Sequence, residues 1–261
     1  MNELEKSILK WQTRASRRKE DGVFITEGIR MFLEIPEERL LKILVSESFS
    51  EAHPELMTEV RRKQQLSGAE LRTVRDEVFR KLSDTLTPQG ILAVVRTFRY
   101  TQEEILDTEK GLYILLENLQ DPGNLGTILR SAEASGVNGV IMNGTCVDIY
   151  NPKVVRATMG ACFRVKFCVV PDLSDTVRRI QQKGGAVYAA HLHGAVPYDQ
   201  KDYTGISAFM IGNEAEGLSD RLTSEADGRI IIPMQGAVES LNAAMAATIL
   251  MFEAARQRRN N

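Results

Sequence analysis

Three segments rich in glycine and in amide, hydroxyl and carboxylate side chains each follow an apolar run. They are residues 117–130 (ENLQDPGNLGTILR), 211–219 (IGNEAEGLS) and 232–242 (IPMQGAVESLN). If the apolar runs are parallel strands, all three segments meet at the carboxyl edge of one sheet, where open parallel sheets bind their ligands. Each segment alone could be a tight connection with helix caps, but three together favour a site.

Several common sites are missing from the chain. It contains no GxGxxG, no GxxxxGK[ST] and no GxSxG, which argues against a Rossmann oxidoreductase, a P-loop nucleotidase and an α/β-hydrolase with Ser240 as nucleophile. The 3 cysteines form no CxxC pair, which excludes a disulfide framework and a cysteine-rich zinc site. We expect no metal.

The elements that must position these segments alternate between strand and helix. Six apolar runs of the second part of the chain are predicted strands: 112–116, 139–142, 165–170, 186–190, 208–211 and 229–232. Most are apolar throughout, as expected of strands covered by helices on both faces. Helices are predicted at 125–135, 174–183 and 241–258. This alternation predicts an α/β fold with a parallel, doubly wound sheet.

The first part of the chain is a smaller α/β pattern. Strands are predicted at 42–45, 71–74 and 91–95, and helices at 28–35, 54–65 and 75–83. Residues 99–110 (RYTQEEILDTEK) are polar and carry no strand signal. We therefore divide the chain into a small domain at 1–98, a linker at 99–110 and a larger domain at 111–261.

Composition is that of an ordinary globular protein. The 261 residues are 43% hydrophobic and 26% charged, with a net charge of −2. No apolar run approaches the ~20 residues that span a bilayer, and the N-terminus is too charged for a signal peptide. We expect no membrane association and a cytoplasmic protein.

One basic stretch near the N-terminus could bind phosphates. Residues 6–19 contain no acid, and their cations include Lys10, Arg14, Arg17, Arg18 and Lys19. Each could neutralise a phosphate and add a salt-dependent increment to RNA binding. Charge alone equally allows a solvated helix face.

The three segments together carry a family resemblance. Residues 121–130 (DPGNLGTILR), 212–217 (GNEAEG) and 233–245 (PMQGAVESLNAAM) closely resemble the three ordered motifs of the SpoU (TrmH) family, RNA ribose 2′-O-methyltransferases of the SPOUT superfamily. Residues 151–161 also resemble the family's segment between its first two motifs. Residues 24–28 (FITEG) and 87–93 (TPQGILA) resemble, more loosely, a ribosomal-protein-like RNA-binding domain.

The resemblance implies a fold and a function that periodicity does not. It implies a deep trefoil knot that binds S-adenosylmethionine (AdoMet), and a homodimer in which the partner chain completes each active site. The expected reaction is methylation of a ribose 2′-hydroxyl in RNA without a metal. Ribosomal RNA is favoured over tRNA by the N-terminal domain type. The competing hypothesis is a non-catalytic RNA-binding or assembly protein with the same fold.

The resemblance also assigns catalytic residues. Arg130 matches the catalytic arginine; because arginine is normally always protonated, we expect it to stabilise the developing alkoxide, and a base role stays open. The alternative for Arg130 is a surface ion pair with Glu133. Asn124 is expected to orient Arg130 or the ribose, and Glu214 to hold the arginine or bind RNA.

The third motif supplies two more expected site residues. Ser240 would lie near the reacting centre, or serve as the N-cap of the last helix, and Asn242 would position the substrate. The residues expected to bind AdoMet, through main-chain groups and apolar packing, are Gly212, Ile232 and Leu241, with Met234 and Leu192 as further candidates.

Overall fold

The computed structural model describes residues 2–192, 195–238 and 240–259, which divide into two compact units. Unit 1 comprises residues 1–98 together with 148–163, and unit 2 comprises 99–147 and 164–261. The two units are described separately.

Unit 1 is built on a four-stranded mixed sheet in the order β1-β4-β2-β3. β4 pairs antiparallel with β1 and with β2, and β3 joins β2 in parallel. The strands are β1 (Val23–Glu27), β2 (Leu40–Ser46), β3 (Glu70–Val74) and β4 (Ile91–Arg96). The helices are α1 (Glu3–Thr13), α2 (Ala15–Asp21), α3 (Ile29–Glu34), α4 (Glu47–Ala52), α5 (Pro54–Ser67), α6 (Asp76–Leu82) and α9 (Pro152–Ala157).

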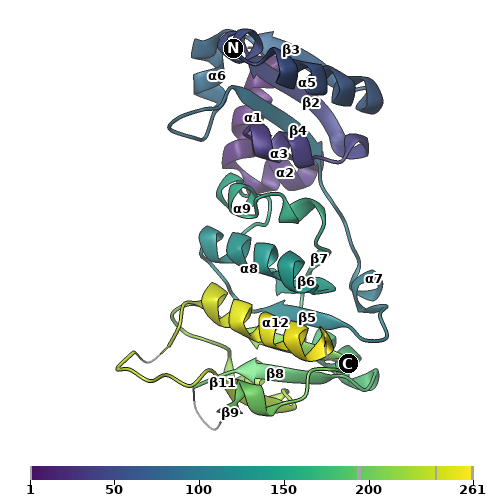
Figure 1. Cartoon of the computed structure of the whole chain (residues 1–261), viewed down its shortest axis with the longest axis vertical. Helices are drawn as coiled ribbons and strands as arrows, with labels where there is room; N and C mark the ends of the chain where they lie inside the picture. The colour runs from purple at the N-terminus through teal and green to yellow at the C-terminus, as the bar shows by residue number, and fades with distance from the viewer. Residues whose placement is uncertain (1, 193–194, 239, 260–261) are drawn as a thin grey trace. The chain divides into compact units, whose positions relative to one another are not determined.

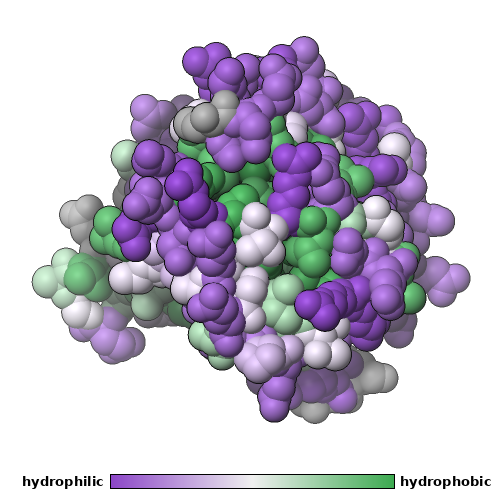
Figure 2. Space-filling view, turned by 90° about the horizontal axis from the view of Figure 1, so that it is seen from above, coloured by the Kyte–Doolittle hydropathy of each residue, from purple (hydrophilic) through white to green (hydrophobic). Residues whose placement is uncertain are grey.

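The core of unit 1 lies between the sheet and the helices α1 and α6. Ile8 of α1 and Phe79 of α6 pack with Leu44 and Leu92 of the central strands. Several apolar side chains over this core remain partly exposed, and Figure 2 shows apolar residues gathered between hydrophilic ones on the face of unit 1 that it views. The predicted small α/β domain is therefore confirmed, with β1 added.

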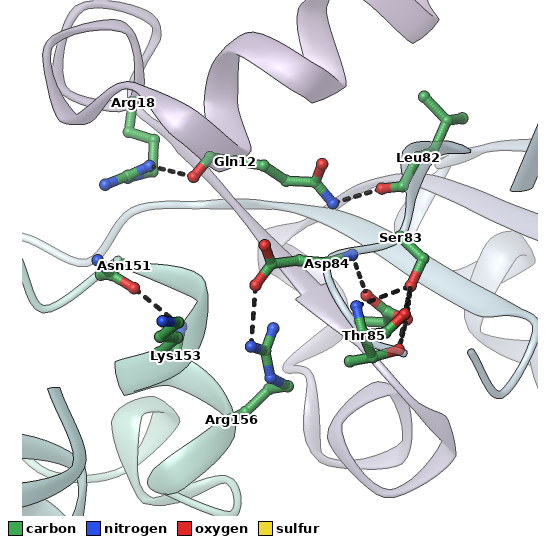
Figure 3. A network of polar contacts seen from close by, with 10 residues as sticks. Gln12, Arg18, Leu82, Ser83, Asp84, Thr85, Asn151, Lys153 and Arg156 are labelled. Atoms are coloured by element: carbon green, nitrogen blue, oxygen red, sulfur yellow. Dashed lines mark hydrogen bonds and ion pairs between the residues drawn. The ribbon is translucent and has the colours of Figure 1, made fainter. Parts of the chain in front are cut away.

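Segment 148–163 follows β6 and precedes β7 in the sequence, yet it packs with unit 1. Arg18 Nε and Nη2 donate to the carboxylate of Asp148 at 2.9 and 2.5 Å. Arg156 of α9 donates to Asp84 at 2.9 Å, a contact drawn in Figure 3. The rings of Phe24 and Tyr150 lie 4.5 Å apart between centroids. The sequence analysis placed this segment in the larger domain.

Unit 2 contains a seven-stranded sheet in the order β7-β6-β5-β10-β8-β11-β9, in which every pair is parallel. The strands are β5 (Leu112–Leu116), β6 (Gly139–Asn143), β7 (Phe167–Val170), β8 (Ala186–Ala190), β9 (Val196–Pro197), β10 (Ser207–Ile211) and β11 (Gly228–Ile231). The helices are α7 (Gln102–Leu106), α8 (Pro122–Ser135), α10 (Leu173–Gln182), α11 (Asp220–Ser224) and α12 (Ala243–Arg259). The predicted parallel sheet is confirmed.

Helices cover both faces of this sheet, which explains its uninterrupted apolar strands. Residues of α7, α10 and α11 pack on the face that carries Tyr113 and Leu115. On the other side α8 and α12 lie side by side (Figure 1), joined by a 2.8 Å hydrogen bond between the hydroxyls of Ser131 and Thr248. The predicted linker contains α7, whose Ile105 and Leu106 are buried in this core. The knot that the family resemblance implies stays a prediction.

Candidate active site

The first of the three segments, residues 117–130, forms the start of α8. Asp121 is the N-cap of this helix, and its side chain accepts a hydrogen bond from the main-chain N–H of Asn124 at 2.7 Å. Pro122 occupies the first helical turn, where its missing N–H costs nothing. This local arrangement buries Asn124 at the carboxyl edge of the sheet.

Glu214 joins the second segment to the first. Its Oε1 accepts from Asn124 Nδ2 at 2.9 Å and from the N–H of Asp121 at 3.0 Å, and its Oε2 accepts from the N–H of Gln120 at 3.2 Å. Partial burial by itself would raise the pKa of Glu214, but the hydrogen bonds from Asn124, Asp121 and Gln120 outweigh it and lower the pKa below its usual range. Glu214 is therefore an ionised acceptor and a weak proton base.

Asn242 joins the third segment to the first. Its Nδ2 donates to Asn124 Oδ1 at 2.9 Å, while its own Oδ1 accepts from the N–H groups of Ala244 and Met245 at 2.9 and 3.3 Å. Asn242 therefore caps α12 and orients Asn124 at the same time. The alternative role of Ser240 as that cap is wrong.

Three of the five predicted catalytic residues thus form one hydrogen-bonded chain. Asn242 donates to Asn124, and Asn124 donates to Glu214. Because each carboxamide has its oxygen and nitrogen engaged, the orientation of Asn124 is determined from both sides. Glu214 holds Asn124 in this arrangement.

Arg130 lies on α8, six residues beyond Asn124, and is exposed. The structure contains no hydrogen bond or ion pair from Arg130 to any other described residue. Glu133, its proposed ion-pair partner, instead binds Arg164. The surface ion pair with Glu133 is therefore wrong as the alternative role of Arg130, and its guanidinium is available to a ligand.

A cavity of about 380 Å³ opens beside this chain. Its walls include Ile211 and Ile230 from the strand ends and Leu250 from α12. A volume of this size is typical of cofactor pockets, as is an apolar wall with a few polar groups. All five residues expected to bind AdoMet line it: Gly212, Ile232, Leu241, Met234 and Leu192. Glu214 and Ser240 also border the cavity.

Gly212 is required by the chain itself. A Cβ atom at this position would lie 2.1 Å from the carbonyl carbon of Gly217. The crowding comes from a tight turn in which the N–H of Asn213 donates to the Gly217 carbonyl at 3.0 Å and the reverse bond is 2.9 Å. The close approach that requires glycine here is made by the neighbouring loop of the chain itself.

The five predicted RNA-binding cations of unit 1 differ in their surroundings. Lys10, Arg14 and Lys19 are exposed, and Arg17 donates to Glu20 at 2.6 Å. Arg18 is only 4% exposed. Its guanidinium is engaged by Asp148 and by the carbonyls of Trp11 and Gln12 (the bond to Gln12 is drawn in Figure 3). Arg18 therefore cannot contact RNA phosphates as predicted, because its donors are buried in a structural ion pair.

Sequence reasoning missed the residues that hold the first segment in place. The main-chain groups of Gln120 and Asp121 bind Glu214, and Asn118, Asn143 and Asn213 form a further set of bonds described below. A carboxamide just after a strand is a weak signal, since the same residue type is common in any turn.

The described residues contain neither a metal-binding cluster nor a membrane-spanning helix. No group of three or more His, Cys, Asp or Glu side chains among residues 2–192, 195–238 and 240–259 is placed to hold a metal ion. No helix in that part of the chain is long and apolar enough to cross a membrane.

Comparison with known proteins finds a match for each of the two main parts of the chain. Residues 111–252 match the SpoU rRNA methylase family, and residues 2–93 match the MRM3-like substrate-binding domain. The 23S rRNA (guanosine(2553)-2′-O)-methyltransferase RlmP of Bacillus subtilis is 32% identical over 71% of this chain and 73% of its own length. The 23S rRNA (guanosine-2′-O-)-methyltransferase RlmB of Shewanella oneidensis is 30% identical over 93% of this chain and 100% of its own.

Solved structures agree with the sequence comparison. The SpoU methyltransferase AviRb of Streptomyces viridochromogenes, in complex with the cofactor AdoMet, superposes with a TM-score of 0.88 at 28% identity and covers 100% of both chains. The AdoMet-bound rRNA methyltransferase of Sinorhizobium meliloti has a TM-score of 0.86 at 29% identity and covers 98% of this chain and 95% of its own. From its motifs, its fold and these relatives, the chain belongs to the SpoU rRNA methylase family.

Proposed function

We propose that this chain is an enzyme that transfers a methyl group from AdoMet to a ribose 2′-hydroxyl of ribosomal RNA. The observation that carries the proposal is the hydrogen-bonded chain Asn242–Asn124–Glu214 at the edge of an apolar cavity, on the three segments that define the family. Relatives that match most of the chain carry the names of 23S rRNA 2′-O-methyltransferases. A protein without this chemistry would not need that polar arrangement.

The cavity fits AdoMet. Its apolar strand ends suit an adenine ring, while the main chain of the lining residues Gly212, Ile232 and Leu241 is expected to supply donors and acceptors for the polar edges. Glu214 brings a negative charge to the same cavity, which suits a ligand with cationic groups. Bound there, AdoMet supplies a methyl group activated by its positively charged sulfur.

The chain's own residues must bind and activate the ribose. Because a ribose hydroxyl is a weak nucleophile, the oxygen needs a group that stabilises its negative charge as the proton leaves. Arg130 is exposed and bound to no other described residue, so its guanidinium can bind that oxygen. We expect Asn124, which is oriented from both sides, to bind the ribose, and Ser240, which lines the cavity, to contact the reacting centre.

Unit 1 is proposed to bind the RNA substrate. It carries the match to a substrate-binding domain, and the exposed cations Lys10, Arg14 and Lys19 lie on or beside its first two helices. Ribosomal RNA is favoured because the rRNA methyltransferase of Sinorhizobium meliloti covers 98% of this chain and so matches both units. The Aquifex aeolicus tRNA-modifying TrmH/SpoU enzyme covers only 61% of this chain, with a TM-score of 0.53.

The enzyme is further proposed to act as a homodimer. Met245 and Phe252 of α12 are 59% and 47% exposed, which is high for large apolar side chains on one helix. A second copy of the chain would cover such residues. Sedimentation equilibrium should give twice the chain mass, and a monomer at micromolar concentration would contradict the dimer.

The function is tested by mapping ribose methylation. Ribosomal RNA and tRNA from a strain lacking the protein are compared with RNA from the complemented strain, and the purified full chain is supplied with AdoMet and the unmodified RNA. The expected result is one 2′-O-methylated rRNA nucleotide that is lost in the deletion strain and restored by the enzyme. If only tRNA is methylated, the substrate is tRNA and not rRNA. If no RNA is methylated, the chain is a non-catalytic RNA-binding protein.

A further inference from the structure

Asn118 has an unusual backbone conformation at the end of β5. Two residues beyond this strand, it has a φ of 56°, in the left-handed region that favours glycine. Asparagine enters this region more readily than other non-glycine residues, and here its contacts with neighbouring side chains hold it there. Those contacts are with Asn143, the last residue of β6. The N–H of Asn118 donates to Asn143 Oδ1 at 3.0 Å, and Asn143 Nδ2 donates to Asn118 Oδ1 at 2.8 Å.

A third asparagine binds the opposite side of the same residue. Asn213, two residues beyond β10, donates from Nδ2 to the main-chain carbonyl of Asn118 at 2.8 Å. Because β6, β5 and β10 are neighbours in the sheet, the three side chains join three consecutive strand ends. We call Asn118, Asn143 and Asn213 the asparagine clamp.

The clamp lies directly before the groups that bind Glu214. The N–H groups of Gln120 and Asp121, two and three residues after Asn118, donate to the carboxylate, and Glu214 itself follows Asn213. The donors and the acceptor of these hydrogen bonds therefore lie only one to three residues from the clamp along the chain. Moving Asn118 relative to Asn213 would move the donors relative to their acceptor, and with it the orientation of Asn124.

We propose that Asn118, held by Asn143 and Asn213, is a positioning residue for methyl transfer. It sets the register between the first and second segments, so that Glu214 holds Asn124 in the orientation the ribose requires. This inference rests on the proposed function. It adds a residue that touches neither substrate nor donor and acts through Glu214.

The chain offers a matched control at the other end of the same strand pair. Asn138 Oδ1 accepts from the N–H of Leu112 at 2.8 Å, joining the loop before β6 to the first residue of β5. Like Asn143, it is an asparagine that binds a main-chain N–H at the end of β5. Asn138 lies at the amino edge of the sheet, away from the cavity. Asn138→Ala therefore measures how much stability such a bond contributes, without an effect on the site.

The test compares Asn118→Gly, Asn143→Ala and Asn138→Ala in the full chain. Glycine at 118 tolerates the positive φ and removes only the side chain. We expect single-turnover methylation at saturating AdoMet and RNA to slow at least tenfold in the first two variants and to stay within twofold of wild type in the third. Both alanine variants should melt earlier than wild type, Asn143→Ala more so, because it loses two hydrogen bonds with Asn118 whereas Asn138→Ala loses one with Leu112. Hydrogen exchange at the Gln120 and Asp121 amides should accelerate at least tenfold in the first two variants only.

Two results would overturn the positioning role. One is a methylation rate in Asn118→Gly and Asn143→Ala no lower than in Asn138→Ala, and the other is unchanged exchange at the Gln120 and Asp121 amides. Failure of the proposed function looks different. In that case the wild-type chain methylates no RNA, and the exchange data decide on their own whether the clamp holds the donors of Glu214.

Discussion

Arg130→Ala should separate catalysis from stability. The side chain is exposed, so its removal takes away no hydrogen bond or ion pair with another described residue. Alanine is also the best helix former, and Arg130 lies inside α8. The free energy of unfolding should therefore change by no more than about 0.5 kcal/mol.

The rate of methyl transfer should change far more. The negative charge on the ribose oxygen grows only as the reaction proceeds, so a guanidinium bound to it stabilises the transition state more than the bound substrate. Losing one such donor slows comparable reactions about a hundredfold, or about 2.7 kcal/mol of transition-state stabilisation. Arg130→Lys should recover little, because an ammonium on a flexible stem does not reproduce the planar fork.

Single-turnover methylation with saturating AdoMet and RNA measures the effect, beside AdoMet binding by calorimetry and a thermal melt. AdoMet affinity should stay near the wild-type value. Arg164→Ala is the matched control. It removes an arginine that pairs with Glu133, a residue of the same helix as Arg130, and it should leave the rate unchanged. A near-normal rate in Arg130→Ala, with a lower melting temperature, would refute the catalytic role.

Further predictions concern the caps, the buried ion pair and pH. Asn242→Ala should cost about 1 kcal/mol in denaturant unfolding through loss of the α12 cap, whereas Ser240→Ala should cost less than about 0.5 kcal/mol. Arg18→Ala should destabilise the chain by about 2–3 kcal/mol, because it removes the charged hydrogen bonds to Asp148, which remains partly exposed to solvent. Lys19→Ala should have no such effect, but should reduce the salt dependence of RNA binding by about one unit of slope. Glu214, whose folded-state pKa is lowered, stabilises the fold fully above its unfolded pKa of about 4.3, and this contribution is lost as pH falls through the folded pKa. The stability difference between wild type and Glu214→Gln should therefore vanish in acid, and a pH-independent difference would contradict the assignment.

The strands of the larger sheet could be predicted because their burial is a local property of the sequence. β5 and β8 are apolar runs of five residues and β10 has four apolar residues after Ser207, and each strand is covered on both faces. β1 was not predicted, because it ends in Thr26 and Glu27, two polar residues that are nevertheless buried. The Glu27 carboxylate accepts from Thr85 Oγ1 at 2.7 Å and from the N–H of Asp84 at 3.1 Å. Partners nearly sixty residues away leave no local signal.

The candidate site, like the fold, has features that the sequence predicts and features that it does not. The identity of Asn124, Glu214 and Asn242 followed from motifs, because the residue types and their order are written in the sequence. Which of these residues bind one another could not be predicted from the motifs, because Ser240 and Asn242 are equally good helix caps by residue type. The position of α12 in the fold makes Asn242 the cap of this helix. There, Asn242 caps the helix with its Oδ1 while its Nδ2 reaches Asn124.

Segment 148–163 limits how far the chain can be divided for experiments. Tyr150 hydrogen-bonds the main chain of Phe98 at both the N–H and the carbonyl, at 2.7 and 2.9 Å, and its ring lies against Phe24. A fragment that starts after residue 98 would contain this segment without those partners and would expose its apolar side chains. The segment is also covalently continuous with residues 143–147, where Thr145 and Cys146 contact the first motif segment through Gln120 and Leu119. A loss of AdoMet binding in such a fragment would therefore reflect disorder that spreads from residue 148 toward that segment, so donor affinity should be measured on the full chain.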